Sequence, residues 1–507
     1  MQTIFPPAIA YGFEDLKVNR SIECDVVIVG AGAGGAAAAR VLSEQGLNVW
    51  IVESGPKTSR FRPNYAHTAR YHMQENGGMV ATGNAMMPIA AGKGVGGSTL
   101  INSALSFVAP DSVLDQWAEL LDDSTWSATH LSATFEEIST LIGVGTTPKS
   151  VAGENNSLIV RGIEKLGWEG GLAPRSTPNC VGCGICYFGC PSNGKASMNL
   201  SLLPRAQAFQ CQIQAEAEVQ NILIEQGEAV GLQAVAIHPD TQERGGTLTI
   251  RASKVILSAG AIGTPKLLWY CGLAEELGPT VGQGLHVHPG STLLATFSEP
   301  IEMWKGATQG AYCHPPGLPG VLPHTFSAPP EACLVAGGFV GSSWQEGLKL
   351  LPNLCGMLVM VSDKGEGTVR SHPDGRAKIT YDFHPDDVQR IKDGLVAVGE
   401  ILLAGGARDL RGPIHGLGVC NSVDELRQRL TPRTIQDFTL YAAHPMSTCR
   451  MSESSNTGVI NRNGETHNIR NLFIADASIF PTSLGVNPQL STMVCATNIA
   501  RKILQMG

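Results

Sequence analysis

The chain has 507 residues and a formal net charge of −8, with 43% hydrophobic residues, 16% charged residues and 59 glycines. This composition excludes a disordered chain and predicts a globular, loop-rich protein of two or three structural units. No run of Lys and Arg offers a phosphate-binding track, so we expect no nucleic-acid partner.

The sequence carries no signal for export or membrane insertion. Residues 1–20 lack the apolar core of a secretory signal, and no stretch reaches 18 uninterrupted apolar residues. We therefore expect no transmembrane segment and a cytoplasmic location. Thirteen cysteines, an odd number, then predict reduced thiols and not a disulfide framework.

The first predicted element is a buried parallel strand that runs into a glycine loop. Residues 25–29 are mostly apolar and β-forming, and three glycines follow with the spacing G-x-G-x-x-G, namely Gly30, Gly32 and Gly35. Residues 36–45 predict a helix whose amino terminus faces a pyrophosphate. A second strand over residues 49–52 leads to Glu53, near the spacing at which an acid meets a ribose. This order predicts a bound dinucleotide without identifying it.

A second glycine-rich stretch covers residues 91–102. It contains Gly94, Gly97 and Ser98, ends at Asn102 and runs into an apolar segment. A surface turn would explain the glycines alone. Because glycine marks places where another group approaches the backbone closely, we favour contact with the cofactor.

Four cysteines form a single run: Cys180, Cys183, Cys186 and Cys190. The spacing C-x2-C-x2-C-x3-C-P is that of bacterial ferredoxins, in which the fourth cysteine often serves a second cluster. No second run exists in this sequence. Three interpretations stay open: a 3Fe-4S or 4Fe-4S cluster, a tetrathiolate zinc site, and reduced loop thiols.

The spacing of apolar residues in the middle of the chain predicts helices and a sheet. Apolar residues recur at helical spacing over residues 135–142 and again after Pro385. Residues 354–361 predict a buried strand, and residues 367–370 and 377–381 predict two neighbouring strands.

A proline-rich segment, residues 314–330, lies before these strands. It carries six prolines among 17 residues, which argues against a helix or a central strand. We expect a long loop that either covers the substrate entrance or connects two domains.

The C-terminal region places polar residues at the ends of predicted elements. Residues 472–475 form a short apolar strand with Asp476 at its carboxyl end, where α/β sheets place ligand-binding groups. Asn487 and Pro488 precede a helical run. Backbone amides at such helix starts can meet a cofactor.

In this order the segments resemble the glucose-methanol-choline oxidoreductase family, whose members are flavoproteins that oxidise alcohols. The resemblance is carried by five segments: residues 30–53, 92–102, 258–268, 285–289 and 444–488. It implies an α/β fold in which an FAD-binding Rossmann-like domain is interleaved with a sheet-containing substrate domain. The implied FAD-binding domain covers residues 20–121, 196–290 and 435–507. The implied substrate domain covers residues 122–195, with the cysteine loop 180–191, and 291–434.

The resemblance identifies the dinucleotide as FAD. It implies that Glu53 holds the adenosine ribose, that the backbone of Val219 meets the adenine and that Asp476 meets the ribityl chain. The glycines of the first loop would hold the pyrophosphate, and Gly97 and Asn102 would lie near the flavin. The full predicted cofactor set is Gly30, Gly32, Gly35, Glu53, Gly94, Gly97, Ser98, Asn102, Val219, Asp476, Ala477, Asn487 and Pro488.

His444 matches the catalytic histidine of the family, and Asn487 occupies its partner position. An imidazole titrates near neutrality, so His444 can take the hydroxyl proton of an alcohol while the carbon's hydride passes to flavin N5. Asn487 cannot act as a base, but its amide can orient the substrate oxygen.

The segment after Asn102 resembles the long-chain alcohol oxidase and cholesterol oxidase-like branch, because it lacks the arginine common in choline and sugar enzymes. We therefore expect an apolar alcohol as substrate, with dioxygen, a quinone or a redox protein as electron acceptor. Some sugar dehydrogenases of the family carry an iron-sulfur cluster at a similar cysteine-rich position, whereas long-chain alcohol oxidases share the segment without one. Two alternatives to alcohol oxidation stay open: a lyase or light-driven decarboxylase on the same scaffold, and a redox subunit that passes electrons through an iron-sulfur cluster.

Overall fold

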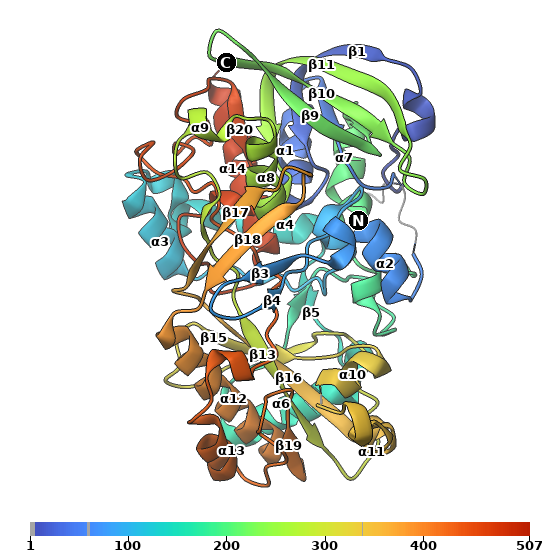
Figure 1. Ribbon diagram of the computed structural model, residues 1–507, viewed down its shortest axis with the longest axis vertical. Helices are drawn as coiled ribbons and strands as arrows, with labels where there is room; N and C mark the ends of the chain where they lie inside the picture. Colours follow the sequence, from blue (N-terminus) through green and yellow to red (C-terminus); the bar gives the residue numbers. More distant parts are fainter. Residues whose placement is uncertain (1–5, 58–60, 337, 507) are drawn as a thin grey trace.

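The computed structural model describes residues 6–57, 61–336 and 338–506. It is elongated, with one sheet-based lobe at each end and a small sheet between them (Figure 1). The helices are α1 (Ala33–Glu44), α2 (Tyr65–His72), α3 (Asp111–Leu120), α4 (Ala128–Leu141), α5 (Lys149–Ala152), α6 (Glu154–Leu166), α7 (Leu202–Ala208), α8 (Gly260–Tyr270), α9 (Ala274–Leu277), α10 (Pro330–Ala336), α11 (Trp344–Leu350), α12 (Pro385–Gly405), α13 (Val423–Leu430) and α14 (Gln489–Gln505).

The first lobe is built on a seven-stranded sheet in the order β8-β2-β1-β11-β10-β9, with β20 also paired to β11. Its strands are β1 (Arg20–Val29), β2 (Val49–Val52), β8 (Gln212–Gln214), β9 (Ala217–Glu225), β10 (Glu228–Ile237), β11 (Arg244–Leu257) and β20 (Leu472–Ile474). Strand β1 is parallel to both β2 and β11, and β20 is parallel to β11. The glycine loop and Asp476 therefore follow strands that end at the same edge of the sheet.

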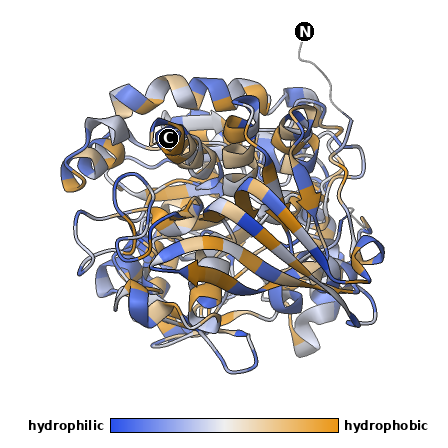
Figure 2. Ribbon diagram, turned by 90° about the horizontal axis from the view of Figure 1, so that it is seen from above, coloured by the Kyte–Doolittle hydropathy of each residue, from blue (hydrophilic) through white to orange (hydrophobic). Residues whose placement is uncertain are grey.

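The burial of this sheet follows its topology. The parallel end of β1 and all of β2 are buried, as expected for strands covered on both faces. The antiparallel strands β9 to β11 alternate buried and exposed residues instead, which Figure 2 shows as alternating hydropathy. The predicted helix after the glycine loop is confirmed. It begins at Ala33, earlier than the predicted start at residue 36, and Gly32 is its N-cap residue.

The second lobe contains a six-stranded sheet in the order β19-β13-β16-β15-β14-β6. Its strands are β6 (Glu169–Leu172), β13 (Gly290–Thr296), β14 (Ala311–His314), β15 (Val321–Thr325), β16 (Leu354–Val361) and β19 (Asp409–Arg411). Helices α6, α12 and α13 cover this sheet on the outer side of the lobe (Figure 1). The predicted buried strand over residues 354–361 and the predicted helix after Pro385 are both confirmed.

The prediction of a strandless loop over residues 314–330 is wrong. Strand β15 lies inside this segment and between two other strands, with Pro323 opposite Val359 of β16. Only one residue pair, Tyr312 with His324, joins β15 to β14 on its other side. Because the ladder on that side is so short, a proline without a backbone N–H does little damage there.

Two smaller sheets complete the chain. The middle sheet has the order β12-β17-β18-β3-β4, and β5 pairs with β7 alone. Their strands are β3 (Val80–Thr82), β4 (Met87–Pro88), β5 (Gly145–Thr146), β7 (Pro174–Arg175), β12 (Gln283–Leu285), β17 (Glu366–Ser371) and β18 (Ala377–Asp382). The predicted neighbouring strands β17 and β18 are confirmed as an antiparallel pair.

Helix α4 lies in the stretch that was predicted for the second lobe, yet it packs in the first. Its buried residues Leu131, Phe135 and Ile138 share a hydrophobic core with α14 and the seven-stranded sheet. The division into two domains at the predicted boundaries stays a prediction. Among residues 6–57, 61–336 and 338–506, no helix combines the length and the apolar character needed to cross a membrane.

Candidate active site

A cavity of about 890 Å³ lies between the two lobes. The glycine loops of the first lobe form one side, and strands β15 and β16 form the other. His444 and Asn487 lie on its wall, together with Asp476 at the end of β20. The cavity thus joins the predicted cofactor loops to the predicted catalytic residues, although the first glycine loop and His444 are more than 400 residues apart in the chain.

The two glycine loops touch each other at the cavity. Gly97 has φ +54°, and a Cβ atom there would lie 2.7 Å from Cα of Gly32. Gly30 has φ +104°, and a Cβ atom there would lie 2.4 Å from the backbone oxygen of Ser258. Because such distances exclude any side chain, these glycines bring bare backbone to the cavity wall.

Two of the predicted cofactor glycines do not line the cavity. A Cβ atom on Gly35 would lie 2.0 Å from the backbone oxygen of Gly30, so Gly35 allows α1 to pack closely on the loop. Gly94 donates its backbone N–H to Oε1 of Glu53 over 3.0 Å. The residues of the predicted set that line the cavity are Gly30, Gly32, Glu53, Gly97, Ser98, Asn102, Val219, Asp476, Ala477, Asn487 and Pro488.

Glu53 joins the loops, a role that its spacing did not predict. Its Oε2 accepts a hydrogen bond from the N–H of Ala31 over 3.0 Å, and its Oε1 accepts from Gly55 over 2.8 Å as well as from Gly94. The side chain is buried. Since a carboxylate oxygen can accept two hydrogen bonds, Oε2 keeps a place for a ribose hydroxyl.

Asp476 caps the short helical turn that follows β20. Its Oδ1 accepts from the N–H of Ser478 over 2.8 Å, and its Oδ2 accepts from the N–H of Gly260 and the hydroxyl of Thr264 over 2.9 and 2.6 Å. Burial raises the pKa of Asp476, while these hydrogen bonds act in the opposite direction. The carboxylate is therefore held rigidly at the carboxyl end of β20.

His444 and Asn487 face each other in the cavity. Nδ2 of Asn487 lies 3.0 Å from Nε2 of His444, and Oδ1 of Asn487 is buried without a hydrogen-bond partner. Burial lowers the pKa of His444 well below its usual value, and charges on His288 and His324 would lower it further. His444 is therefore neutral near neutral pH, which is the form that can accept a proton.

His288 contacts His444. Its segment, residues 285–289, contributed to the family resemblance, but the sequence analysis predicted no role for His288 itself. Its Nε2 accepts a hydrogen bond from the backbone N–H of Gly485 over 2.9 Å, so the neutral ring carries its proton on Nδ1. Nδ1 lies 3.4 Å from Nδ1 of His444, which is long for a hydrogen bond. Burial lowers the pKa of His288 to about 4, so it too is neutral.

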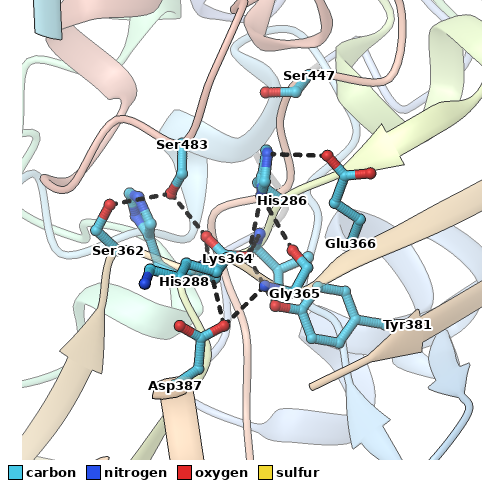
Figure 3. A network of polar contacts seen from close by, with 12 residues as sticks. His286, His288, Ser362, Lys364, Gly365, Glu366, Tyr381, Asp387, Ser447 and Ser483 are labelled. Carbon is cyan, nitrogen blue, oxygen red and sulfur yellow. Dashed lines mark hydrogen bonds and ion pairs between the residues drawn. The ribbon is translucent and has the colours of Figure 1, made fainter. Parts of the chain in front are cut away.

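A buried carboxylate, Asp363, anchors the segment that carries His288. It accepts hydrogen bonds from the N–H of Val287, the hydroxyl of Tyr381 and the hydroxyl of Ser483 over 2.8, 2.8 and 2.7 Å. Burial alone would raise the pKa of Asp363, but His286, His288 and the hydroxyl of Ser483 together outweigh burial and lower it. Figure 3 shows Ser483 approaching the segment of His286 and His288 from a distant part of the chain.

The wall opposite the glycine loops comes from the six-stranded sheet. Phe326, Leu358 and Met360 give it an apolar surface, and His324 of β15 is a polar residue among them. Sequence reasoning missed His324 and the nearby Gln309, because the prolines around His324 hid strand β15. The pairing of His324 with Leu358 across β15 and β16 places it at the cavity.

The structure does not support a metal cluster at the cysteine run. Among the described residues, no three His, Cys, Asp or Glu side chains form a group that could hold a metal ion. Cys180, Cys183, Cys186 and Cys190 surround a void of about 10 Å³, which is barely the volume that one water needs. The described residues therefore give no support to the iron-sulfur or the zinc interpretation, and the four cysteines are free thiols in this structure.

A buried cation takes part in this cysteine loop instead. Lys195 lines the same void, and its Nζ donates to the backbone oxygens of Leu100, Asn102 and Cys186. Burial lowers the pKa of Lys195 to about 8. The loop therefore supports the segment that ends at Asn102 on the cavity wall.

Comparison with known proteins assigns these segments to one protein family. The family model for GMC oxidoreductases matches residues 69–290 with its N-terminal part and residues 363–496 with its C-terminal part. A model for an FAD-binding domain matches residues 25–78, which contain β1, the first glycine loop and Glu53.

Individual relatives cover almost the whole chain. An uncharacterized GMC-type oxidoreductase of Mycobacterium tuberculosis is 33% identical over 94% of this chain and 75% of its own length. A long-chain-alcohol oxidase of Arabidopsis thaliana is 26% identical over 96% of this chain and 67% of its own. The crystal structure of pyridoxine 4-oxidase from Mesorbium loti superposes with a TM-score of 0.73, at 19% identity over 95% of this chain and 99% of that one, so the overall fold is the same.

The cavity fits FAD on the evidence of its own wall. The bare backbone at Gly30, Gly32 and Gly97 suits a pyrophosphate that approaches closely, and the amino terminus of α1 lies directly behind this loop. Glu53 has an unused acceptor position for a ribose hydroxyl. The partnerless Oδ1 of Asn487 marks a place where a bound molecule completes the site.

Proposed function

The chain belongs to the GMC oxidoreductase family of FAD-dependent enzymes, and we propose that it oxidises a primary or secondary alcohol with an apolar body to an aldehyde or ketone. The observation that carries this proposal is the contact of 3.0 Å between His444 and Asn487 on the wall of a cavity that continues to the glycine loops. The pair gives the site one proton acceptor and one amide at the same point.

Bound FAD supplies the acceptor for the hydride that leaves the carbinol carbon. His444 takes the hydroxyl proton of the alcohol at Nε2, where the alcohol O–H would replace the amide of Asn487 as the hydrogen-bond donor. The electron pair left on the oxygen forms the second C–O bond as the C–H bond breaks. This step needs a neutral imidazole, and burial keeps His444 in that form. The step leaves the carbonyl compound and a proton on His444, and FAD, when bound, would take up the two electrons and the hydrogen of the broken C–H bond.

Asn487 orients the substrate oxygen in this proposal. An amide neither gains nor loses a proton near neutral pH, so its contribution is a fixed hydrogen bond. Pro488 starts α14 directly after it, and the 17 residues of that helix hold its backbone in place. Negative charge that develops on the oxygen is stabilised by a donor whose position is already set.

The apolar body of the alcohol would lie against Phe326, Leu358 and Met360. An aliphatic or sterol-like chain gains free energy by leaving water for such a surface, roughly 25 cal/mol per Å² of apolar area. The similarity to a long-chain-alcohol oxidase supports the same choice. Dioxygen, a quinone or a redox protein would then reoxidise the cofactor.

Other chemistry on the same scaffold finds less support. A lyase would also use a base for a hydroxyl proton, so the pair of His444 and Asn487 fits both reactions, and the similarity to a long-chain-alcohol oxidase favours oxidation. A redox subunit that passes electrons through an iron-sulfur cluster lacks its cluster site among the described residues. We therefore keep alcohol oxidation as the single proposed function.

Anaerobic reduction of the bound flavin tests this function. Purified holoprotein is mixed with medium-chain, long-chain and sterol alcohols without oxygen, and the flavin absorbance is followed. We expect bleaching with apolar alcohols and formation of the matching carbonyl compound. A flavin that stays oxidised with every alcohol, but is bleached by dithionite, would contradict the proposal.

A further inference from the structure

His324 is a buried polar side chain with one unused nitrogen at the cavity. It is 2% exposed, and its Nε2 has no hydrogen-bond partner. Its other ring nitrogen, Nδ1, lies 3.1 Å from Nε2 of Gln309, which also lines the cavity. A buried polar atom without a partner is rare in a folded protein, and it indicates a bound group that the fold is built to receive.

The contact with Gln309 sets the hydrogen-bonding character of the free nitrogen. The amide Nε2 of Gln309 can only donate, so Nδ1 of His324 accepts. A neutral imidazole then carries its proton on Nε2. Burial lowers the pKa of His324 to about 3, so the ring keeps this single proton throughout the neutral range. The cavity wall therefore offers one N–H donor.

The dyad of Gln309 and His324 is held by a common anchor. Oδ1 of Asn156 accepts from the N–H of Gly310 over 2.9 Å and from the hydroxyl of Thr325 over 2.6 Å. These are the neighbours of Gln309 and His324 in the chain. On the other side of Gln309, the hydroxyl of Thr308 donates to that of Ser103 over 3.1 Å. The donor is thus preorganised, and binding to it costs little ordering.

The position of His324 decides which part of the substrate it meets. It lies opposite Leu358 in the sheet and beside Phe326, on the wall that would hold the body of the alcohol. The reacting oxygen already has His444 and Asn487. A donor set in an apolar wall therefore meets an oxygen on the substrate body.

We propose that His324, held by Gln309, donates a hydrogen bond from Nε2 to a second oxygen on the substrate, so that the preferred substrate is an apolar alcohol that also carries an ether, carbonyl or hydroxyl oxygen. This inference rests on the proposed function and makes its substrate class narrower. It also gives His324 a role in specificity, because an alcohol without the second oxygen leaves the buried donor unpaired.

A series of ether alcohols tests the inference. The probes are n-nonanol and its analogues in which one ether oxygen replaces a methylene at successive positions, and the readout is kcat/KM of the holoenzyme. An ether only accepts hydrogen bonds, so it reports on a donor alone. We expect one or two positions to exceed n-nonanol by about tenfold or more. If every ether is equal to or worse than n-nonanol, the inference is wrong.

Variants separate recognition from a structural role. His324→Leu should remove the preference for the ether, so that within this variant kcat/KM with the best ether falls to the value with n-nonanol. Gln309→Met, which releases the ring without removing it, should weaken the preference in the same direction. His314→Leu is the matched control, because His314 is exposed at the end of the neighbouring strand β14. Equal losses with both kinds of alcohol in His324→Leu would overturn the inference.

The two proposals fail in different ways. If no alcohol bleaches the flavin, the proposed function itself is wrong. If alcohols bleach the flavin but the position of the ether oxygen has no effect, alcohol oxidation stands and only the role of His324 is contradicted. Flavin content and thermal unfolding of each variant identify a variant that has failed to fold, and Gln309→Met then supplies the deciding measurement.

Discussion

Nδ1 of His288 lies 3.4 Å from Nδ1 of His444, and the opposite nitrogen of His288 accepts the backbone N–H of Gly485. His288 thereby links the histidine on the cavity wall to the loop just before Asn487. The contacts of its ring are with His444 and Gly485, so we expect it to act by positioning His444.

We predict that His288→Leu lowers kcat by up to about a hundredfold with little change in KM, because a misplaced base loses rate more than binding. His288→Gln should recover much of this loss, since its amide oxygen can accept the backbone N–H of Gly485 in place of the ring nitrogen. Steady-state kinetics of both variants, with flavin content as a control, check the prediction. Parallel loss of flavin and activity would place His288 in folding instead.

His444→Ala should reduce the rate of flavin bleaching by alcohols by about 10² to 10⁴, the usual contribution of a general base. The flavin should stay bound, because the ring of His444 contacts His288 and Asn487 and, among the described residues, not the glycine loops. Asn487→Ala should cost less, since the amide carries no proton. Stopped-flow absorbance under anaerobic conditions measures both, and an unchanged rate in His444→Ala would remove it from the mechanism.

The acid limb of the activity should lie below pH 6.5. His444 acts as a base only when neutral, and its pKa is lowered by burial, so activity should persist at pH values where a free histidine is half protonated. It should then fall as the pH drops through the lowered pKa. A profile of kcat/KM with an acid limb above pH 7 would contradict this assignment.

Stability should also fall on the acid side. Burial lowers the pKa of His288 to about 4 and that of His324 to about 3, whereas an unfolded histidine has a pKa of about 6.5. Between these values the unfolded chain binds more protons, so the free energy of unfolding decreases as the pH falls from about 6.5. His288 alone accounts for roughly 3 kcal/mol at pH 4. Denaturant unfolding should show a smaller pH dependence in His324→Leu than in the His314→Leu control.

The parts of the fold that follow from local pattern could be read from the sequence. Strand β16 is continuous and apolar, and α12 has a regular stripe after Pro385, so their burial requires no knowledge of their partners. The first glycine loop has a fixed order of strand, loop and helix. The motifs that contain His444 and Asn487 could be placed in the same way, by resemblance.

The remaining parts of the site depend on contacts between distant segments. His324 lies in a proline-rich stretch, and only pairing with β16 makes that stretch a strand. The role of Glu53 as a clamp needs the backbone of Gly94, 41 residues away, to arrive at its carboxylate. The cysteine spacing matches a ferredoxin, yet the volume that the cysteines enclose is a property of the folded loop alone.

Glu53→Gln should weaken FAD binding and lower stability together. The carboxylate accepts three backbone N–H groups, and an amide would turn its NH₂ toward at least one of them. We expect a loss of about 1 to 3 kcal/mol in the free energy of unfolding of the apoprotein. Fluorescence titration with FAD and denaturant unfolding measure the two effects. Weaker FAD binding with unchanged apoprotein stability would contradict the clamp and leave only a contact with the ribose.

Cys186 should matter for stability and the other three cysteines of its run should not. Nη2 of Arg175 donates to its sulfur over 3.3 Å, and both Arg175 and Lys195 are almost fully buried. Burial alone would raise the pKa of Cys186, but Arg175 and Lys195 lower it, and Cys186 acts on the pKa of Lys195 more strongly than Cys190 or Cys183 does. Cys186→Ala leaves two buried cations without this partner, and we expect a loss of about 3 kcal/mol in the free energy of unfolding. Cys183 is exposed, so Cys183→Ala is the matched control and should unfold like the wild type.

Iron, zinc and acid-labile sulfide should all be well below one equivalent in anaerobically purified protein, because the cysteines enclose too little volume for a cluster. Equal destabilisation by both substitutions, together with stoichiometric iron and sulfide, would reverse this assignment and restore a metal to the loop.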